Sequence, residues 1–286
     1  MNTYKIIVSY DGTDYQGWQE QDNGPTIVGT LQDRFCEVFG REITVLGASR
    51  TDAGVHEFGQ VAIFKTDLLL DGAVMKRAWN NSLPAAVTVR ELELVADDFN
   101  PHHGVLEKTY EYRFCLQRPL VYDHRYTWYY RWPVDIDKLR DVLQVFVGEH
   151  DFRSFCTGND LKSTVRTVHS IDVIKNGEQS YKIIFKAPGF LRYMIRRMTG
   201  AALEVASRPF LTADATKVVL KACNPSHALP CAPALGLTLV NIEYGVAPFD
   251  KLPPSPRLPA FVKTTADKMA RRQGERVYHS INLGRE

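Results

Sequence analysis

Hydrophobic and polar residues follow two different periods along the first hundred residues. The opening segment, Thr3–Tyr10, has the pattern of a β-strand, and Thr26–Phe39 has apolar residues at helical spacing. Four further elements are predicted here: strands at Ile43–Ser49 and Gln60–Lys65, a helix at Asp71–Asn81 and a strand at Val87–Leu94. The predicted order is β-α-β-β-α-β.

The second half of the chain repeats this order with one additional strand and one additional helix. It opens on the strand "EKTYEYRFCL" and contains two strands separated by the turn residues Asn176-Gly177. The predicted elements are strands at Glu107–Leu116 and Tyr126–Tyr130, a helix at Asp135–Val147, strands at Thr167–Lys175 and Ser180–Ala187, helices at Phe190–Ser207 and Thr212–Ala222, and a strand at Gly236–Gly245.

Two copies of one pattern without a repeated sequence predict a pseudo-duplicated α+β protein. This order of elements favours a continuous, mainly antiparallel sheet with helices on one face and a central basic cleft between the halves. The predicted divisions are an N-terminal half at 1–104, a C-terminal half at 105–245 and a proline-rich, basic tail at 246–286. A short basic helix is predicted within the tail, at Thr264–Gly274.

Composition is that of an ordinary soluble globular protein, with 44% apolar and 24% charged residues among 286. No apolar run approaches the roughly 20 residues of a membrane span, and no N-terminal leader is present, so a cytoplasmic location is expected. The five cysteines are scattered, which makes a disulfide framework or a zinc site improbable, and no metal site is predicted.

The net charge of +2 says little about partners, because nucleic-acid binding depends on where positive charges gather. Two basic clusters stand out. One is "FLRYMIRRM" at Phe190–Met198, and the other is the tail after Tyr244. Arg196 lies beside the apolar stripe of the predicted helix, where a buried charge needs a partner such as a carboxylate.

The segment "GASRTDAGVHEFGQVAIF" places Arg50 and Asp52 two residues apart, between two predicted strands. An Asp before Ala-Gly is most often a turn residue that caps backbone N–H groups. Alternatively, the strands present a carboxylate for chemistry, and a neighbouring guanidinium favours its ionised form. Similarly, Tyr110 and Tyr112 share one face of a strand, either as a core pair or as a platform on which an extracted base stacks.

Together these motifs closely resemble the TruA family of tRNA pseudouridine synthases. The resemblance covers roughly Thr3 to Tyr244 in order. Its most specific motif is "RTDAGVH" at Arg50–His56. The supporting motifs are "YDGTDYQGWQEQ", "DDF", "KTYEYRF", "GEHDFRSF", "RTV", "GFLRYMIRRMTG" and "GLTLVNIEY".

The resemblance implies a cofactor-free isomerase that detaches the uracil of a tRNA uridine, turns it and rejoins it through carbon five. Asp52 matches the catalytic aspartate, and the order of its covalent steps stays open. Tyr110 matches the tyrosine that stacks on the target base and is a candidate proton acceptor. Arg196 matches the partner of the aspartate, and Arg50 the arginine that holds the flipped nucleotide's place.

The resemblance also implies a wider binding site and a particular substrate. Family members act as homodimers on positions 38, 39 and 40 of the tRNA anticodon stem-loop. Further residues implied to contact RNA or position the base are Thr51, His56, Trp18, Gln19, Arg192 and Arg197.

One stretch departs from the family pattern and bears on which uridines are chosen. "FNPHHGV" places His102 and Gly104 where the family typically shows an arginine and a serine, and the basic tail could add compensating phosphate contacts. Two rival functions follow from the same residues: a tRNA-binding or chaperone protein that has lost catalysis, and a carboxylate-dependent glycosidase that releases free uracil.

Overall fold

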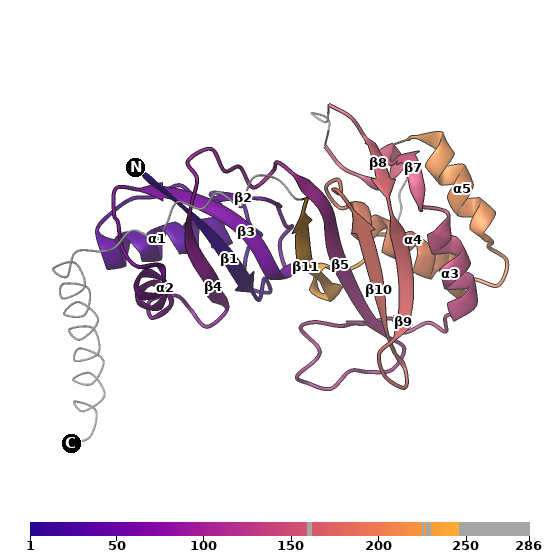
Figure 1. Cartoon of the computed structure of the whole chain (residues 1–286). Helices are drawn as coiled ribbons and strands as arrows, with labels where there is room; N and C mark the ends of the chain where they lie inside the picture. Colours follow the sequence, from indigo (N-terminus) through magenta and orange to yellow (C-terminus); the bar gives the residue numbers. More distant parts are fainter. Residues whose placement is uncertain (159–161, 225, 227–229, 246–286) are drawn as a thin grey trace, which may run out of the picture.

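The computed structural model describes residues 1–158, 162–224, 226 and 230–245, so the predicted tail 246–286 and its helix lie outside the described residues. Figure 1 shows the two halves side by side along one sheet. The N-terminal half contains β1 (Asn2–Tyr10), α1 (Ile27–Phe39), β2 (Leu46–Gly47), β3 (His56–Thr66), α2 (Gly72–Asn80) and β4 (Val87–Val95). The C-terminal half contains β5 (Val105–Cys115), β6 (Trp128–Tyr129), α3 (Ile136–Gln144), β7 (Gly148–Asp151), β8 (Val165–Val168), β9 (Ser170–Lys175), β10 (Ser180–Ala187), α4 (Met194–Ser207), α5 (Ala213–Ala222) and β11 (Leu237–Tyr244).

The main sheet is continuous across both halves. Its order is β4-β1-β3-β11-β5-β10-β9, with β2 added to β3 and β6 added to β5. Along this order only the β3–β11 contact, which joins the halves, is parallel. Each half therefore has the same arrangement of strands. The last strand (β4 or β11) lies beside the first strand (β1 or β5), which lies beside the strand that precedes the last helical segment (β3 or β10). The predicted pseudo-duplication and mainly antiparallel sheet are confirmed.

The register places the helices of both halves on the same face of the sheet. Tyr10 lies opposite Glu57, Glu57 lies beside Leu239, and Leu239 lies opposite Tyr110. Residues directly opposite each other in a ladder point to one face, so this row marks a single face across the junction. The side chains of α1 and α2 pack on that face at one end and those of α3 and α4 at the other.

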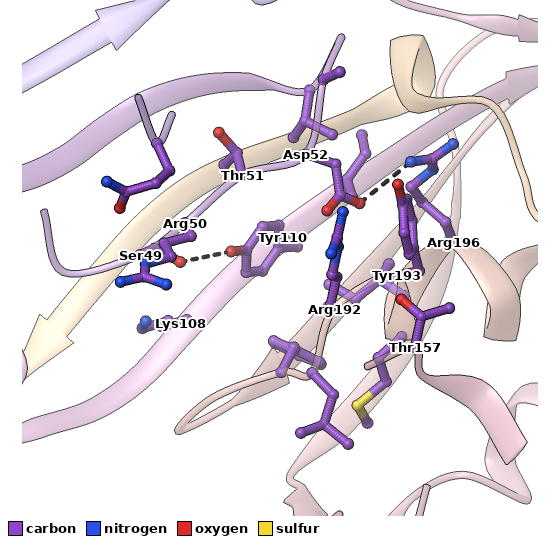
Figure 2. Close-up of a pocket in the computed structure, with 18 of the residues that line it drawn as sticks. Ser49, Arg50, Thr51, Asp52, Lys108, Tyr110, Thr157, Arg192, Tyr193 and Arg196 are labelled. Atoms are coloured by element: carbon purple, nitrogen blue, oxygen red, sulfur yellow. Dashed lines mark hydrogen bonds and ion pairs between the residues drawn. The ribbon is translucent and has the colours of Figure 1, made fainter. Parts of the chain in front are cut away.

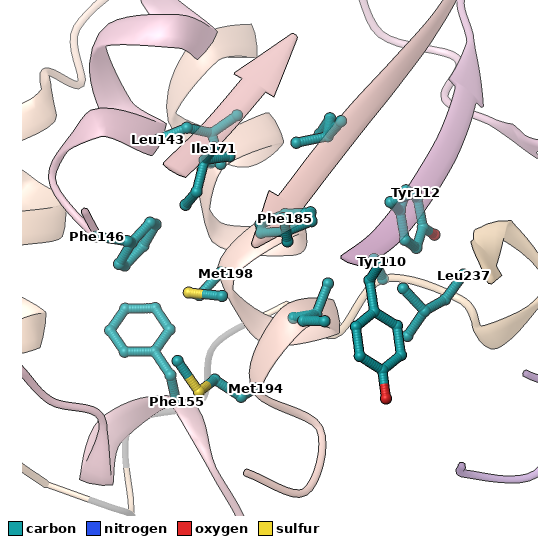
Figure 3. Close-up of a cluster of buried hydrophobic side chains, with 14 of the residues drawn as sticks. Tyr110, Tyr112, Leu143, Phe146, Phe155, Ile171, Phe185, Met194, Met198 and Leu237 are labelled. Carbon is teal, nitrogen blue, oxygen red and sulfur yellow. The ribbon is translucent and has the colours of Figure 1, made fainter. Parts of the chain in front are cut away.

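Two aromatic-rich cores fix the helices to the sheet. In the N-terminal half, Trp79 of α2 packs edge-on against Phe35 of α1 and Phe64 of β3. In the C-terminal half, Figure 3 shows Met194 and Met198 of α4 beneath Phe185, with Tyr110 nearby. Each core is covered by the helices of its own half, and the row of sheet residues between them, from Tyr10 to Tyr110, is also buried.

Several predicted boundaries are wrong, and the changes at β2 and α4 have a local cause. The strand expected at Ile43–Ser49 shrinks to β2, because the Gln32 side chain, not a strand, accepts from the Val45 N–H at 3.0 Å. The helix expected from Phe190 begins at Met194, after Tyr193 adopts a left-handed conformation with φ 62°. The single strand expected at Thr167–Lys175 is divided into β8 and β9, and β8 leaves the main sheet to pair with β7, which was not predicted.

Candidate active site

A cleft of about 860 Å³ lies at the junction of the two halves. Its walls come from the β2–β3 loop (residues 48–55) on one side and from β5 and the start of α4 on the other (Figure 2). Five of the lining residues are cationic and one, Asp52, is acidic; the cations are Arg50, Lys108, Arg166, Arg192 and Arg196. Among the described residues, the lining is therefore strongly electropositive around one carboxylate, and the predicted central basic cleft is present.

The β2–β3 loop is held against a second loop by two close backbone approaches. A side-chain carbon on Gly12 would lie 2.0 Å from the Val55 carbonyl oxygen, and one on Gly17 would lie 2.5 Å from the Thr51 carbonyl oxygen. Gly17 also has φ +93°, which glycine adopts at little cost. These two glycines of "YDGTDYQGWQ" let residues 11–18 brace the loop that carries Asp52.

Asp52 forms an ion pair with Arg196 across the cleft. Arg196 Nη1 donates to Asp52 Oδ2 at 3.2 Å, and the two side chains are only 15% and 18% exposed, respectively (Figure 2). The Arg196 Nε donates to the Ala232 carbonyl at 2.8 Å, which fixes the guanidinium from behind. The pair joins a loop of the N-terminal half to a helix of the C-terminal half.

Burial raises the pKa of Asp52 above its ordinary value, and the charges of Arg196 and Arg192 partly oppose that rise. The guanidinium contributed by α4 therefore holds the carboxylate closer to its ionised state than burial alone would. Spacing alone offered Arg50 as this neighbouring guanidinium, whereas the resemblance implied Arg196. The ion pair of Asp52 is with Arg196, and Arg50 is exposed and lies beside Ser49 and Lys108 in Figure 2.

Tyr110 is 6% exposed and lies in the cleft next to the loop. Its hydroxyl is 3.0 Å from the Ser49 Oγ, and its ring contacts Phe190 edge-on with centroids 5.3 Å apart. Burial raises the pKa of Tyr110, and the nearby carboxyls of Glu57 and Asp52 add to the rise, so the phenol is neutral at pH 7.

Tyr193 forms part of the same wall as Arg196. The guanidinium groups of Arg192 and Arg196 lie 5.2 and 4.9 Å from the centre of its ring. Cations over an aromatic face are attracted to it, so this ring helps to hold both arginines at the cleft.

The structure brings most of the predicted site residues to one place. Asp52, Tyr110, Arg196, Arg50, Thr51, Gln19 and Arg192 all line the cleft. The other three predicted residues, His56, Trp18 and Arg197, lie elsewhere.

These three residues have other partners. His56 is 2% exposed; its Nδ1 lies 3.1 Å from Asp11 Oδ1 and its Nε2 lies 3.2 Å from the Leu235 carbonyl oxygen, so it ties the two halves together. Trp18 is 2% exposed and lies against Gly47. Arg197 donates to the Ser154 carbonyl at 3.4 Å. Within the described residues, each of the three therefore has a structural partner outside the lining of the cleft, and its predicted role toward RNA stays a prediction.

Several residues of the cleft were not predicted from the sequence. Ser49 and Lys108 line it beside Tyr110, and Phe190 and Leu191 line it from the segment before α4. The sequence signal for these residues was their position beside the quoted motif residues. Lys108, for example, lies two residues before Tyr110 and therefore shares its face of the strand. His102, from the departing stretch "FNPHHGV", also lines the cleft.

Comparison with known proteins identifies the class of protein that this site belongs to. The chain matches the tRNA pseudouridine synthase family over residues 6–101 and 142–245, which include Asp52 and Arg196. It is 36% identical over 256 residues to tRNA pseudouridine synthase A of Thermodesulfovibrio yellowstonii, covering 85% of this chain and 100% of the relative. It is 38% identical over 248 residues to the protein of that name from Moorella thermoacetica, with 85% and 100% covered.

The chain belongs to the tRNA pseudouridine synthase family, whose members are isomerases that convert uridine to pseudouridine. A third relative, tRNA pseudouridine synthase A of Limosilactobacillus reuteri, is 37% identical over 253 residues, covering 86% of this chain and 98% of that protein. In the part of the chain that the structure describes, no helix could span a membrane, and no three His, Cys, Asp or Glu side chains are grouped as metal ligands would be.

Proposed function

We propose that the cleft binds a uridine extracted from the tRNA anticodon stem-loop, at positions 38, 39 or 40, and isomerises it with Asp52 as the nucleophile. The observation that carries the proposal is the partly buried Asp52–Arg196 ion pair at 3.2 Å, in a cleft that also contains Tyr110. A carboxylate can form a covalent bond to a sugar or base carbon, and an adjacent guanidinium keeps it ionised for that step.

The reaction is balanced without an oxidant or reductant. The bond between the sugar C1′ and the base N1 breaks, a bond between C1′ and C5 forms, a proton leaves C5, and a proton is gained at N1. No electrons enter or leave, so we propose that the enzyme works without a cofactor. The detached base must be retained while it turns, which a cleft walled by Tyr110 and Phe190 can do.

Tyr110 serves best as a surface for the base. A neutral phenol with a raised pKa accepts a proton only after it has lost its own, and loss is disfavoured here by burial and by nearby carboxyls. We therefore propose that Tyr110 packs against the base and holds the loop through Ser49, and that the C5 proton passes to solvent water.

The cations around the cleft suit an RNA substrate. Extraction of a base from a stem costs a few kcal/mol of unpairing and unstacking. Contacts between phosphates and Arg50, Lys108, Arg166 or Arg192 offset this cost and make binding depend on salt. We further propose that the enzyme acts as a homodimer, which sedimentation at assay concentrations would test.

The proposal is tested by mapping pseudouridine in tRNA before and after treatment with the purified protein. We expect new pseudouridine at one or more of positions 38, 39 and 40. Modification confined to other positions would overturn the assigned substrate region, and binding of tRNA without modification would favour the catalytically altered RNA-binding protein.

A further inference from the structure

A fully buried carboxyl group lies behind the β2–β3 loop, outside the cleft. Glu57 is the second residue of β3, is 0% exposed and lies opposite Tyr10 in the sheet. The Tyr10 hydroxyl donates to Glu57 Oε2 at 2.5 Å, and Gln60 Nε2 donates to the same oxygen at 3.1 Å. The other oxygen, Oε1, is buried with no hydrogen-bond partner among the described residues.

The first connection from Glu57 leads to the residue before Asp52. The Tyr10 hydroxyl lies 2.6 Å from Thr51 Oγ1 as well as bonding Glu57. A phenol has a single proton, so when Tyr10 donates to Glu57 the Thr51 hydroxyl donates to Tyr10. Glu57 therefore sets the direction of both hydrogen bonds and fixes the Thr51 side chain.

The second connection leads to Tyr110. Gln60 Nε2 donates to the Ser49 carbonyl at 2.7 Å, and Gln60 Oε1 accepts from the Ser49 N–H at 3.1 Å. This pair of bonds clamps the backbone of Ser49, whose Oγ lies 3.0 Å from the Tyr110 hydroxyl. Gln60 also donates to Glu57. One carboxyl group therefore orients both the Tyr10 hydroxyl, which bonds Thr51, and the Gln60 amide, which bonds Ser49.

Stability alone gives no reason for a carboxyl group at this position. Burying a carboxyl with one unpartnered oxygen costs folding free energy, and an apolar side chain of similar size often costs less. The charge of Lys108 opposes this cost, but its Nζ donates to the Ala48 carbonyl at 2.8 Å, and no ion pair with Glu57 is found within the described residues. Burial raises the pKa of Glu57 well above its ordinary value.

We propose that Glu57 is a positioning residue for the isomerisation: through Tyr10 and Gln60 it holds the segment Ser49–Asp52 so that the Asp52 carboxylate faces the reacting base beside Tyr110. The inference rests on the proposed function of the cleft. The positioning role needs an oxygen atom at position 57 that accepts hydrogen bonds. It does not depend on a negative charge there, since both hydrogen bonds are donated to one oxygen.

The Tyr10→Phe variant tests the first connection. It keeps the ring, which stacks on Trp18 at 6.1 Å, and removes only the hydroxyl. We expect kcat for pseudouridine formation to fall about tenfold with KM for tRNA unchanged, because a small displacement of a reacting group costs rate. The matched control is Tyr4→Phe: Tyr4 is also on β1 and 1% exposed, but its hydroxyl lies near the carbonyls of Leu68 and Leu70, away from the cleft.

We expect Tyr4→Phe to lower the melting temperature without lowering kcat. If Tyr10→Phe retains wild-type kcat, or if both variants lose kcat in proportion to lost stability, Tyr10 has a structural role only and the proposal is overturned.

Substitution of Glu57 itself separates charge from hydrogen bonding. Glu57→Gln keeps an oxygen that accepts from Tyr10 and Gln60, so kcat should stay within about threefold of wild type, whereas Glu57→Leu should lose about tenfold in kcat at constant KM. Equal kcat values for the two variants, measured below their melting temperatures, would overturn the proposal. A wild-type protein that forms no pseudouridine would instead overturn the proposed function.

Discussion

Two connections of the sheet, one before β3 and one before β10, occupy equivalent places in the two halves. They differ in length, exposure and hydrogen-bond partners. The β9–β10 turn (residues 176–179) is short and exposed throughout; the Asn176 N–H donates to the Ser180 carbonyl at 2.8 Å, and the Gln179 carbonyl accepts from the Leu116 N–H at 2.8 Å. The β2–β3 loop is longer and bonds to other segments: Thr51 accepts from the Trp18 N–H at 3.2 Å, and the Gly54 N–H donates to Tyr15 at 3.2 Å.

This difference shows how a duplicated fold acquires a single active site. None of residues 176–179 lines the cleft, whereas the β2–β3 loop, which bonds to residues 15–18, places the Asp52 carboxylate in it. The cost is dependence on distant residues, since Asp52 is held by Arg196 of α4 and its loop by residues 11–18. Substitutions around the loop should therefore affect catalysis, and equivalent substitutions around the turn should not.

Loss of the ion pair should have the largest effect among these neighbours of Asp52. In Arg196→Met, kcat should fall on the order of 10²-fold, because a charge that stabilises the reacting carboxylate is removed. Ionised Asp52 is the active form, so activity falls as pH drops through the pKa of Asp52. Removing the guanidinium that lowers this pKa should shift the acid limb of the kcat profile to higher pH.

The control for that variant is Arg208→Met. Arg208 follows α4 and pairs with Glu204 at 2.7 Å, away from the cleft. Its kcat and pH profile should match wild type. An acid limb that stays in place in Arg196→Met would mean that Arg196 does not control the ionisation of Asp52.

Glycine substitution should distinguish the two connections by stability as well as by rate. Gly17→Ala forces a carbon to 2.5 Å from the Thr51 carbonyl oxygen at a φ of +93°, and should cost about 1–3 kcal/mol of unfolding free energy and most of the activity. Gly177→Ala, in the β9–β10 turn, meets only Ser180 Cβ at 3.4 Å and should be tolerated. Denaturant unfolding and initial rates measure both. Similar losses in the two variants would show that the loop is no more constrained than the turn.

The smallest effect is expected at the rim of the cleft. Arg50→Ala should weaken tRNA binding and reduce the slope of log K against log salt concentration by about one, because one phosphate contact is lost. Arg140→Ala is the matched control, since Arg140 is an exposed arginine of α3 paired with Asp137. An unchanged salt slope in Arg50→Ala would remove Arg50 from the RNA-binding surface.

The order of elements could be predicted from the sequence because hydrophobic period and turn residues are local signals. Thr26 and Asp71, for example, cap α1 and α2 with side chains that accept from Gly29 and from Ala73 and Val74. β7 and the division between β8 and β9 could not be predicted, because a two-stranded sheet of four-residue strands depends on pairing across distant parts of the chain.

Site residues could be predicted where they belong to a motif of known chemistry. They could not be predicted where their role depends on contacts with residues distant in the sequence. Asp52, Tyr110 and Arg196 meet in the cleft as the resemblance implied. His56 belongs to the same motif as Asp52 but follows it into β3, where it is buried. Glu57 carried no sequence signal, because only the register of β1 and β3 places it against Tyr10.

The most direct test uses tRNA carrying tritium at C5 of uracil, treated with wild-type protein and with Asp52→Asn. Isomerisation replaces the C5–H bond by a bond to the sugar, so wild type should release tritium to water without releasing free uracil. Asp52→Asn, which keeps the shape and loses the nucleophile, should lower that release on the order of 10⁴-fold. Tritium release by Asp52→Asn at the wild-type rate, or free uracil from the wild type, would contradict the assignment of Asp52 as the nucleophile of a uridine isomerase.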